Sequence, residues 1–108
     1  MMTPEEKREF VLRAQLMLGK LKQDTELSPM DRTDAVTALE AAALFARGRI
    51  IRHGVTKLFT LDAVRLYRHM ANLKHYSPED RAYFLEVSKV LAEMFPEDKK
   101  AEGKKRRR

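Results

Sequence analysis

The sequence predicts an all-α protein, a compact bundle of four helices, or of five if the central connector is also helical. Three segments begin with a hydroxyl residue, a proline and a nearby acid, which is typical of helix N-termini. Apolar residues then recur at helical period over four stretches. With only four Gly and no Trp or Cys in 108 residues, the composition suits helices with one buried face. We expect a single helical domain over residues 1–95.

The first helix is expected over about residues 3–23, where Thr3-Pro4-Glu5-Glu6 provides the opening pattern. The Thr3 hydroxyl can accept a hydrogen bond from an unpaired backbone N–H, and Glu6 can return one. The inward stripe holds Phe10, Val11, Ala14, Met17, Leu18 and Leu21. Leu12 and Leu16 point the opposite way, so they either contact a partner or pack on another helix.

The second helix, about 29–46, and the fourth, about 78–95, open with Ser28-Pro29-Met30-Asp31 and Ser77-Pro78-Glu79-Asp80. The expected inward residues of the second helix are Ala35, Val36, Leu39, Ala42, Ala43 and Ala46. Those of the fourth are Tyr83, Phe84, Val87, Val90, Leu91 and Met94. Leu44 and Phe45 lie off the stripe, so the second helix is expected to touch several neighbours or a partner chain.

The third helix is expected over about 61–74, with Thr60 as a weaker N-cap and Phe59 packed against Val64. Its inward residues are Ala63, Leu66, Tyr67, Met70 and Leu73. The connector before it contains glycines and many β-branched residues. A short β-hairpin at about 49–59 suits this composition, and an irregular loop or an extra helix are the alternatives.

Residues 55–70 resemble the wing-then-helix segment of MerR-type DNA-binding regulators. The resemblance covers sixteen residues and lacks the helix-turn-helix that precedes this segment in that family. It therefore implies no role for any individual residue, and no family is assigned to the chain.

The excess positive charge lies in two parts of the chain. Residues 47–76 carry seven Lys and Arg against Asp62 alone, a net charge of +6, whereas 28–46 and 77–95 are each −2. Residues 96–108, here called the basic tail, carry seven basic and three acidic side chains. The basic tail has no large apolar residue and is expected to be disordered. It could add non-specific phosphate affinity, act as a nuclear-localisation signal or simply be solvated.

The third helix gathers Arg65, Arg68, His69 and Asn72 on the arc opposite its apolar face. Arg and Asn side chains can bond guanine and adenine edges with two hydrogen bonds, and Arg neutralises phosphate. The expected phosphate contacts are Arg47, Arg49, Arg52, Lys57 and Lys74. The alternatives are an ordinary polar helix face and a surface that meets an acidic protein.

Catalytic motifs are absent from the sequence, so we expect no enzyme, no cofactor, no metal and no small-molecule substrate. The three histidines, His53, His69 and His75, lack the spacing of a metal pair on one helix face. No apolar run is long enough for a membrane span. Most aromatic residues fall on core faces, with Tyr76 the best candidate for an exposed ring, so duplex or structured nucleic acid is favoured over single strands.

The leading functional hypothesis is therefore a small nucleic-acid-binding protein, either a DNA-binding regulator or a subunit of a nucleoprotein complex. Duplex DNA is the favoured partner and structured RNA the alternative. The second hypothesis is an adaptor or inhibitor that binds an acidic protein surface. Leu12, Leu16, Leu44 and Phe45 would then form a homodimer or partner interface. We expect a cytoplasmic protein, associated with the nucleoid in a bacterium or nuclear in a eukaryote.

Overall fold

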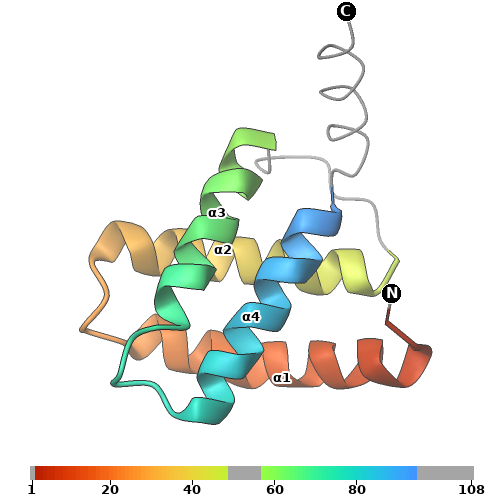
Figure 1. Ribbon diagram of the computed structural model, residues 1–108, viewed down its shortest axis with the longest axis horizontal. Helices are drawn as coiled ribbons and strands as arrows, with labels where there is room; N and C mark the ends of the chain where they lie inside the picture. The colour runs from red at the N-terminus through yellow and green to blue at the C-terminus, as the bar shows by residue number, and fades with distance from the viewer. Residues whose placement is uncertain (1, 49–56, 95–108) are drawn as a thin grey trace, which may run out of the picture.

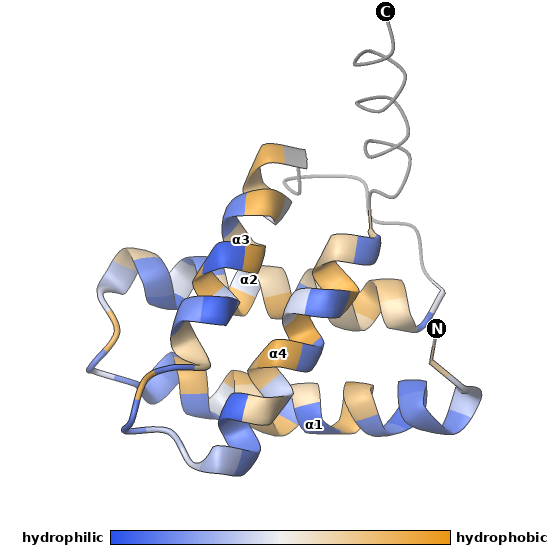
Figure 2. Ribbon diagram, viewed as in Figure 1, coloured by the Kyte–Doolittle hydropathy of each residue, from blue (hydrophilic) through white to orange (hydrophobic). Residues whose placement is uncertain are grey.

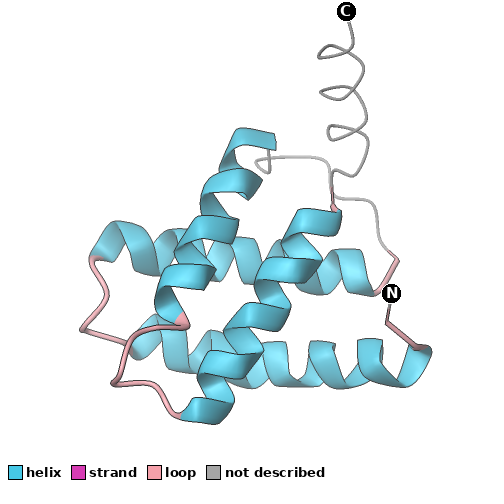
Figure 3. Ribbon diagram, in the orientation of Figure 1, coloured by secondary structure: helices cyan, strands magenta, loops and turns pink. Residues whose placement is uncertain are grey.

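The computed structural model describes residues 2–48 and 57–94, which form four helices and no strand (Figure 3). The helices are α1 (Pro4–Gln23), α2 (Pro29–Ala46), α3 (Lys57–Met70) and α4 (Pro78–Glu93). The predicted all-α, four-helix bundle is confirmed. The basic tail and residues 49–56 lie outside the described residues, so the hairpin, loop and extra-helix alternatives for 49–56 stay predictions.

The four helices form two antiparallel hairpins that cross each other (Figure 1). In one hairpin α1 packs along α2, and in the other α3 packs along α4. The second hairpin lies across the first, where α2 contacts both α3 and α4. The α1–α2 and α3–α4 loops come together at one end of the molecule.

Three helices begin as the sequence predicts. The Thr3 hydroxyl accepts a 3.1 Å hydrogen bond from the Glu6 N–H, and the Glu6 carboxylate accepts a 2.8 Å bond from the Thr3 N–H. Ser28 and Ser77 likewise accept bonds from the backbone three residues on, both at 3.1 Å. The reciprocal acid bond is recorded only at α1 among the described residues. At α4 the acid, Asp80, instead forms a 3.1 Å ion pair with Lys20 of α1.

The α2 helix ends at a glycine whose backbone needs conformational freedom. Gly48 has φ +77°, the left-handed region, and its N–H donates a 2.9 Å bond to the Phe45 carbonyl. An L-residue with a side chain is strained there, whereas glycine is not. This glycine therefore ends the helical conformation directly before residues 49–56, which the structure does not describe.

The core lies between the two hairpins and is built from the inward stripes of all four helices. On α1 the predicted Phe10, Ala14, Met17 and Leu21 are all buried. The stripe of α2 differs slightly from the prediction: Ala38 and Ala41 are buried, while Val36 and Ala43 are only partly so. Five rings fill the centre in tilted or edge-on contacts: Phe10 on Tyr83, and Tyr67 and Tyr76 on Phe84.

The prediction for the start of α3 was wrong. The helix begins at Lys57, so residues 57–59, which were expected to belong to a hairpin, a loop or a separate short helix, are part of α3. Thr60 is not an N-cap but lies within the helix, only 2% exposed. The reason is tertiary packing: Thr60 continues the buried stripe of Ala63, Val64 and Tyr67 by one turn. The helix also ends earlier than expected, at Met70.

Each helix in the described part of the chain is too short or too polar to cross a lipid bilayer.

Candidate nucleic-acid interface

The side of α3 that faces away from the core carries three of the predicted site residues. Ala63, Val64, Tyr67 and Met70 point into the bundle, whereas Arg65, Arg68 and His69 are exposed. The Arg65 guanidinium lies 4.0 Å from the Asp62 carboxylate, and both side chains are about four-fifths exposed. Such a surface pair contributes little stability and leaves Arg65 available to another anion. Arg68 and His69 have no ion-pair partner within the residues that the structure describes.

Asn72 has a structural task that the sequence did not reveal. Its side-chain amide N–H donates a 3.1 Å hydrogen bond to the Arg68 carbonyl, just beyond the end of α3. The amide thus satisfies one of the carbonyls that a helix C-terminus leaves unpaired. A base contact through that N–H would require the capping bond to break, so a role in reading bases is less favourable for Asn72 than for Arg65.

The other predicted basic residues do not all join this face. Arg47 is the C-cap of α2 and is exposed, whereas Lys74 is exposed in the α3–α4 loop. Figure 1 shows the end of α2 and the α3–α4 loop on opposite sides of the molecule. Lys57 is the first residue of α3, but the position of its side chain is not described. Arg49 and Arg52 lie outside the described residues.

Two leucines share the face with the arginines, and sequence reasoning missed them. Leu58 is 73% exposed and Leu61 is 47% exposed. Together with Arg65, Arg68 and Asn72 they follow spacings of three and four residues, which place them along one side of a helix. Figure 2 shows hydrophobic and hydrophilic residues side by side on α3. We call Leu58, Leu61, Arg65, Arg68 and His69 the outer face of α3.

The four predicted partner residues lie on two helices, α1 and α2. Leu12 and Leu16 are 55% and 73% exposed, one turn apart on the outward side of α1. Leu44 and Phe45 are just over one-third exposed, and as consecutive helical residues they point about 100° apart. Phe45 lines a small hollow with Met2 and Val90. The outward stripe of α1 is therefore the more exposed apolar surface of the two.

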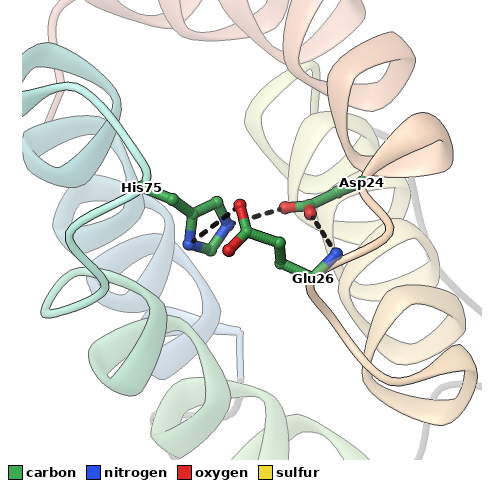
Figure 4. Close-up of side chains that lie close together, drawn as sticks. All are labelled: Asp24, Glu26 and His75. Carbon is green, nitrogen blue, oxygen red and sulfur yellow. Dashed lines mark hydrogen bonds and ion pairs between the residues drawn. The ribbon is translucent and has the colours of Figure 1, made fainter.

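The two loops at the end of the bundle are joined by a polar cluster that the sequence did not reveal. The carboxylate of Asp24 lies 3.1 Å from His75 Nε2 and accepts a hydrogen bond from the Glu26 N–H (Figure 4). It also accepts a hydrogen bond from the Tyr76 hydroxyl. The Glu26 carboxylate lies 3.9 Å from the other ring nitrogen of His75. We call Asp24, Glu26, His75 and Tyr76 the loop cluster.

The loop cluster corrects the expectation that Tyr76 is exposed and bears on the expectation that the chain has no metal site. Tyr76, expected to be exposed, is 7% exposed, because its ring packs edge-on against Phe84 while its hydroxyl reaches Asp24. Asp24, Glu26 and His75 could together offer a metal ion one nitrogen and two oxygen ligands. Hydrogen bonds within the protein already account for the position of Asp24, so this geometry gives no independent reason to place an ion there.

Burial and hydrogen bonding shift the pKa of the Asp24 carboxyl group in opposite directions. Burial alone would raise the pKa of its carboxyl group, but the bonds from Tyr76 and His75 outweigh burial and hold that pKa below the usual value. The same contact, added to burial, raises the pKa of the Tyr76 hydroxyl. Asp24 is therefore charged and Tyr76 neutral at neutral pH, as a donor–acceptor pair requires.

Comparison with protein-family models, with curated proteins and with solved structures found no match. Function is therefore inferred from the surface chemistry of the chain alone.

Proposed function

We propose that this chain is a non-enzymatic nucleic-acid-binding protein that uses the outer face of α3. The observation that supports this most directly is the pair Arg65 and Arg68, exposed one turn apart on a helix whose opposite side is buried. A guanidinium can neutralise phosphate or bond both acceptors of a guanine edge. A helix whose buried side packs on a bundle is also the usual element that enters a DNA major groove.

Duplex DNA is the favoured partner, and structured RNA is the alternative. Proteins that hold single strands stack bases on exposed aromatic rings. In the described part of the chain Phe10, Tyr67, Tyr76, Tyr83 and Phe84 are all buried, which leaves few rings for stacking. A regulator or a small nucleoprotein subunit fits these properties. It would act in the cytoplasm, on the nucleoid of a bacterium, or in the nucleus of a eukaryote.

Fluorescence anisotropy with a short labelled duplex tests the proposal. The variants to compare are Arg65→Ala/Arg68→Ala and a control, Arg8→Ala/Lys22→Ala, which removes the same charge from α1. With contacts of about 1 kcal/mol or more each, the α3 variant should bind at least about 30-fold more weakly. Between about 50 mM and about 200 mM salt its affinity should also fall less steeply than that of wild type.

The proposal is wrong if both double variants bind equally well. It is also wrong if replacing the basic residues of the basic tail with Gln abolishes binding while Arg65→Ala/Arg68→Ala leaves it intact. The second result would mean that the affinity is only the non-specific attraction of the basic tail for phosphate.

The second candidate function is a protein-interaction adaptor or inhibitor, acting as a dimer or within a larger assembly. The observation that favours it is the exposure of Leu12 and Leu16, which nothing in the described bundle covers. Exposed apolar side chains at i and i+4 on a helix are the usual anchors of a helix that docks on a partner. Leu58 and Leu61 could serve the same purpose on α3, where Arg65 and Arg68 would meet acidic groups of that partner.

A further inference from the structure

An acidic hollow lies between α1 and α4, away from the outer face of α3. Its volume is about 400 Å³. Its apolar lining comes from Met2, Phe10 and Val90, and its carboxylates come from Glu6, Glu9, Glu86 and Glu93. Carboxylates around apolar side chains suit a segment that presents cationic heads on aliphatic stems, which is the chemistry of Lys and Arg.

Three of the four carboxylates have no partner among the residues that the structure describes. Glu6 is already bonded to the Thr3 N–H, but Glu9, Glu86 and Glu93 are exposed and form no ion pair there.

Two basic residues also line the hollow, and one of them is committed elsewhere. The Arg13 guanidinium stacks over the Tyr83 ring at 4.8 Å from its centroid and donates a 3.5 Å hydrogen bond to the Glu79 carbonyl. Among the described residues that line the hollow, that leaves Lys89 as the one uncommitted cation, against Glu9, Glu86 and Glu93. The hollow therefore keeps an uncompensated negative charge.

We propose that the acidic hollow binds the basic tail of the same chain. Glu93, at the end of α4, lines the hollow, and the basic tail follows α4 directly. The tail's five consecutive basic residues, 104–108, complement the three unpaired carboxylates. The thirteen residues 96–108 can reach up to about 40 Å, so the rim of the hollow lies within reach of the whole run.

This contact would regulate the protein if, as proposed above, it binds nucleic acid. A tail held by glutamates cannot at the same time neutralise phosphates, so the acidic hollow and the nucleic acid would compete for it. Binding of the tail to phosphate would then free the hollow. At low salt, where the tail–hollow contact is least screened, the contact would lower the non-specific affinity for nucleic acid that the tail supplies. The tail–hollow contact itself does not depend on nucleic-acid binding.

Paramagnetic relaxation enhancement in the full chain tests the contact. Because the chain has no Cys, Gly103→Cys supplies a single spin-label site that leaves every charge in place. At low salt we expect amide signals of Glu9, Glu86 and Glu93 to broaden severalfold more than those of the loop cluster at the other end. The broadening should disappear in high salt, where charges on the surface are screened.

The deciding variants are Glu9→Gln/Glu86→Gln/Glu93→Gln and a control with the same charge change, Asp34→Asn/Glu40→Gln/Glu79→Gln. The first should abolish the broadening and the control should keep it. Absent broadening at low salt, equal loss in both variants, or broadening seen only between labelled and unlabelled copies would each overturn the intramolecular contact. The relaxation experiment contains no nucleic acid. Failure of the tail–hollow contact can therefore be distinguished from failure of the proposed nucleic-acid binding by the outer face of α3.

Discussion

The hydroxyl of Tyr67 donates a 2.6 Å hydrogen bond to the carbonyl oxygen of Ala35 and so joins α3 to α2 inside the core. Tyr83 makes the corresponding 2.8 Å bond to the Phe10 carbonyl and joins α4 to α1. Both tyrosines are completely buried. Burial raises the pKa of each hydroxyl above its usual value, so both remain neutral donors. Each helix of one hairpin is thus bonded to a helix of the other.

Tyr67→Phe should lower the free energy of unfolding by about 1 kcal/mol, the usual net value of a buried hydrogen bond. The ring contact with Phe84 would remain, so the variant isolates the hydroxyl. Urea denaturation at neutral pH measures the change. Tyr67→Ala, which also removes the ring, should cost about 3–5 kcal/mol. Equal stability of Tyr67→Phe and wild type would show that the bond contributes nothing.

The two described glycines should respond oppositely to alanine. A Cβ on Gly19 would meet nothing within 4 Å, so Gly19→Ala should stabilise α1 by roughly 0.5–1 kcal/mol. Gly48 has equal space but φ +77°, so Gly48→Ala should destabilise by about 1–2 kcal/mol. Thermal unfolding should separate the two melting temperatures by several degrees. A stability change of the same sign in both variants would contradict the left-handed backbone of Gly48.

Asp24 should make stability depend on pH in acid. Because its folded pKa is lowered, its contribution is fully present above the unfolded value of about 3.9 and is lost as the pH falls through the folded value. Asp24→Asn lacks that contribution. The stability difference between wild type and Asp24→Asn should therefore be largest near neutral pH and shrink below about pH 4.

Denaturation midpoints measured across that range check the prediction for Asp24. Glu40→Gln is the control, because Glu40 is exposed and has no partner among the described residues. Its difference from wild type should stay near zero at every pH. A difference for Asp24→Asn that does not change with pH would mean that the loop cluster depends on shape rather than on the charge of Asp24.

Leu12→Lys/Leu16→Lys should separate folding from association. Both side chains are more than half exposed, so the variant should keep the unfolding free energy within about 0.5 kcal/mol of wild type for each change. If the outward stripe of α1 is a dimer surface, sedimentation velocity should show a dimer for wild type and a monomer for the variant. A wild type that is monomeric at every concentration excludes self-association and leaves a different protein as the partner.

The helices were predictable where the local sequence alone determines their start. At α1, α2 and α4 the hydroxyl residue and the proline after it act within one turn, and the structure shows each cap. At α3 no hydroxyl residue followed by proline precedes the helix. Phe59 favours a strand by its own preference, and the helix is extended there because Thr60 and its neighbours are buried against the bundle. That contact is not visible in a linear pattern.

The candidate site was predictable only in part, because only some of its features follow from the local sequence. The exposure of Arg65 and Arg68 follows from the helical period, and the structure confirms it. Leu58 could have been placed on the same face only if the helix had been started four residues earlier. The loop cluster was out of reach, because His75 and Tyr76 lie 51 and 52 residues from Asp24 in the sequence. Only the crossing of the hairpins brings them together.

The crossed hairpins also have a kinetic consequence. Within each hairpin the contacts are close in sequence and can form early, because little loop entropy opposes them. The tyrosine bonds join residues 32 and 73 positions apart and can form only when the hairpins dock. Interactions formed after the transition state slow unfolding without speeding folding. The two tyrosine hydroxyls should thus govern how long the molecule stays folded, whereas the hairpins govern how fast it folds.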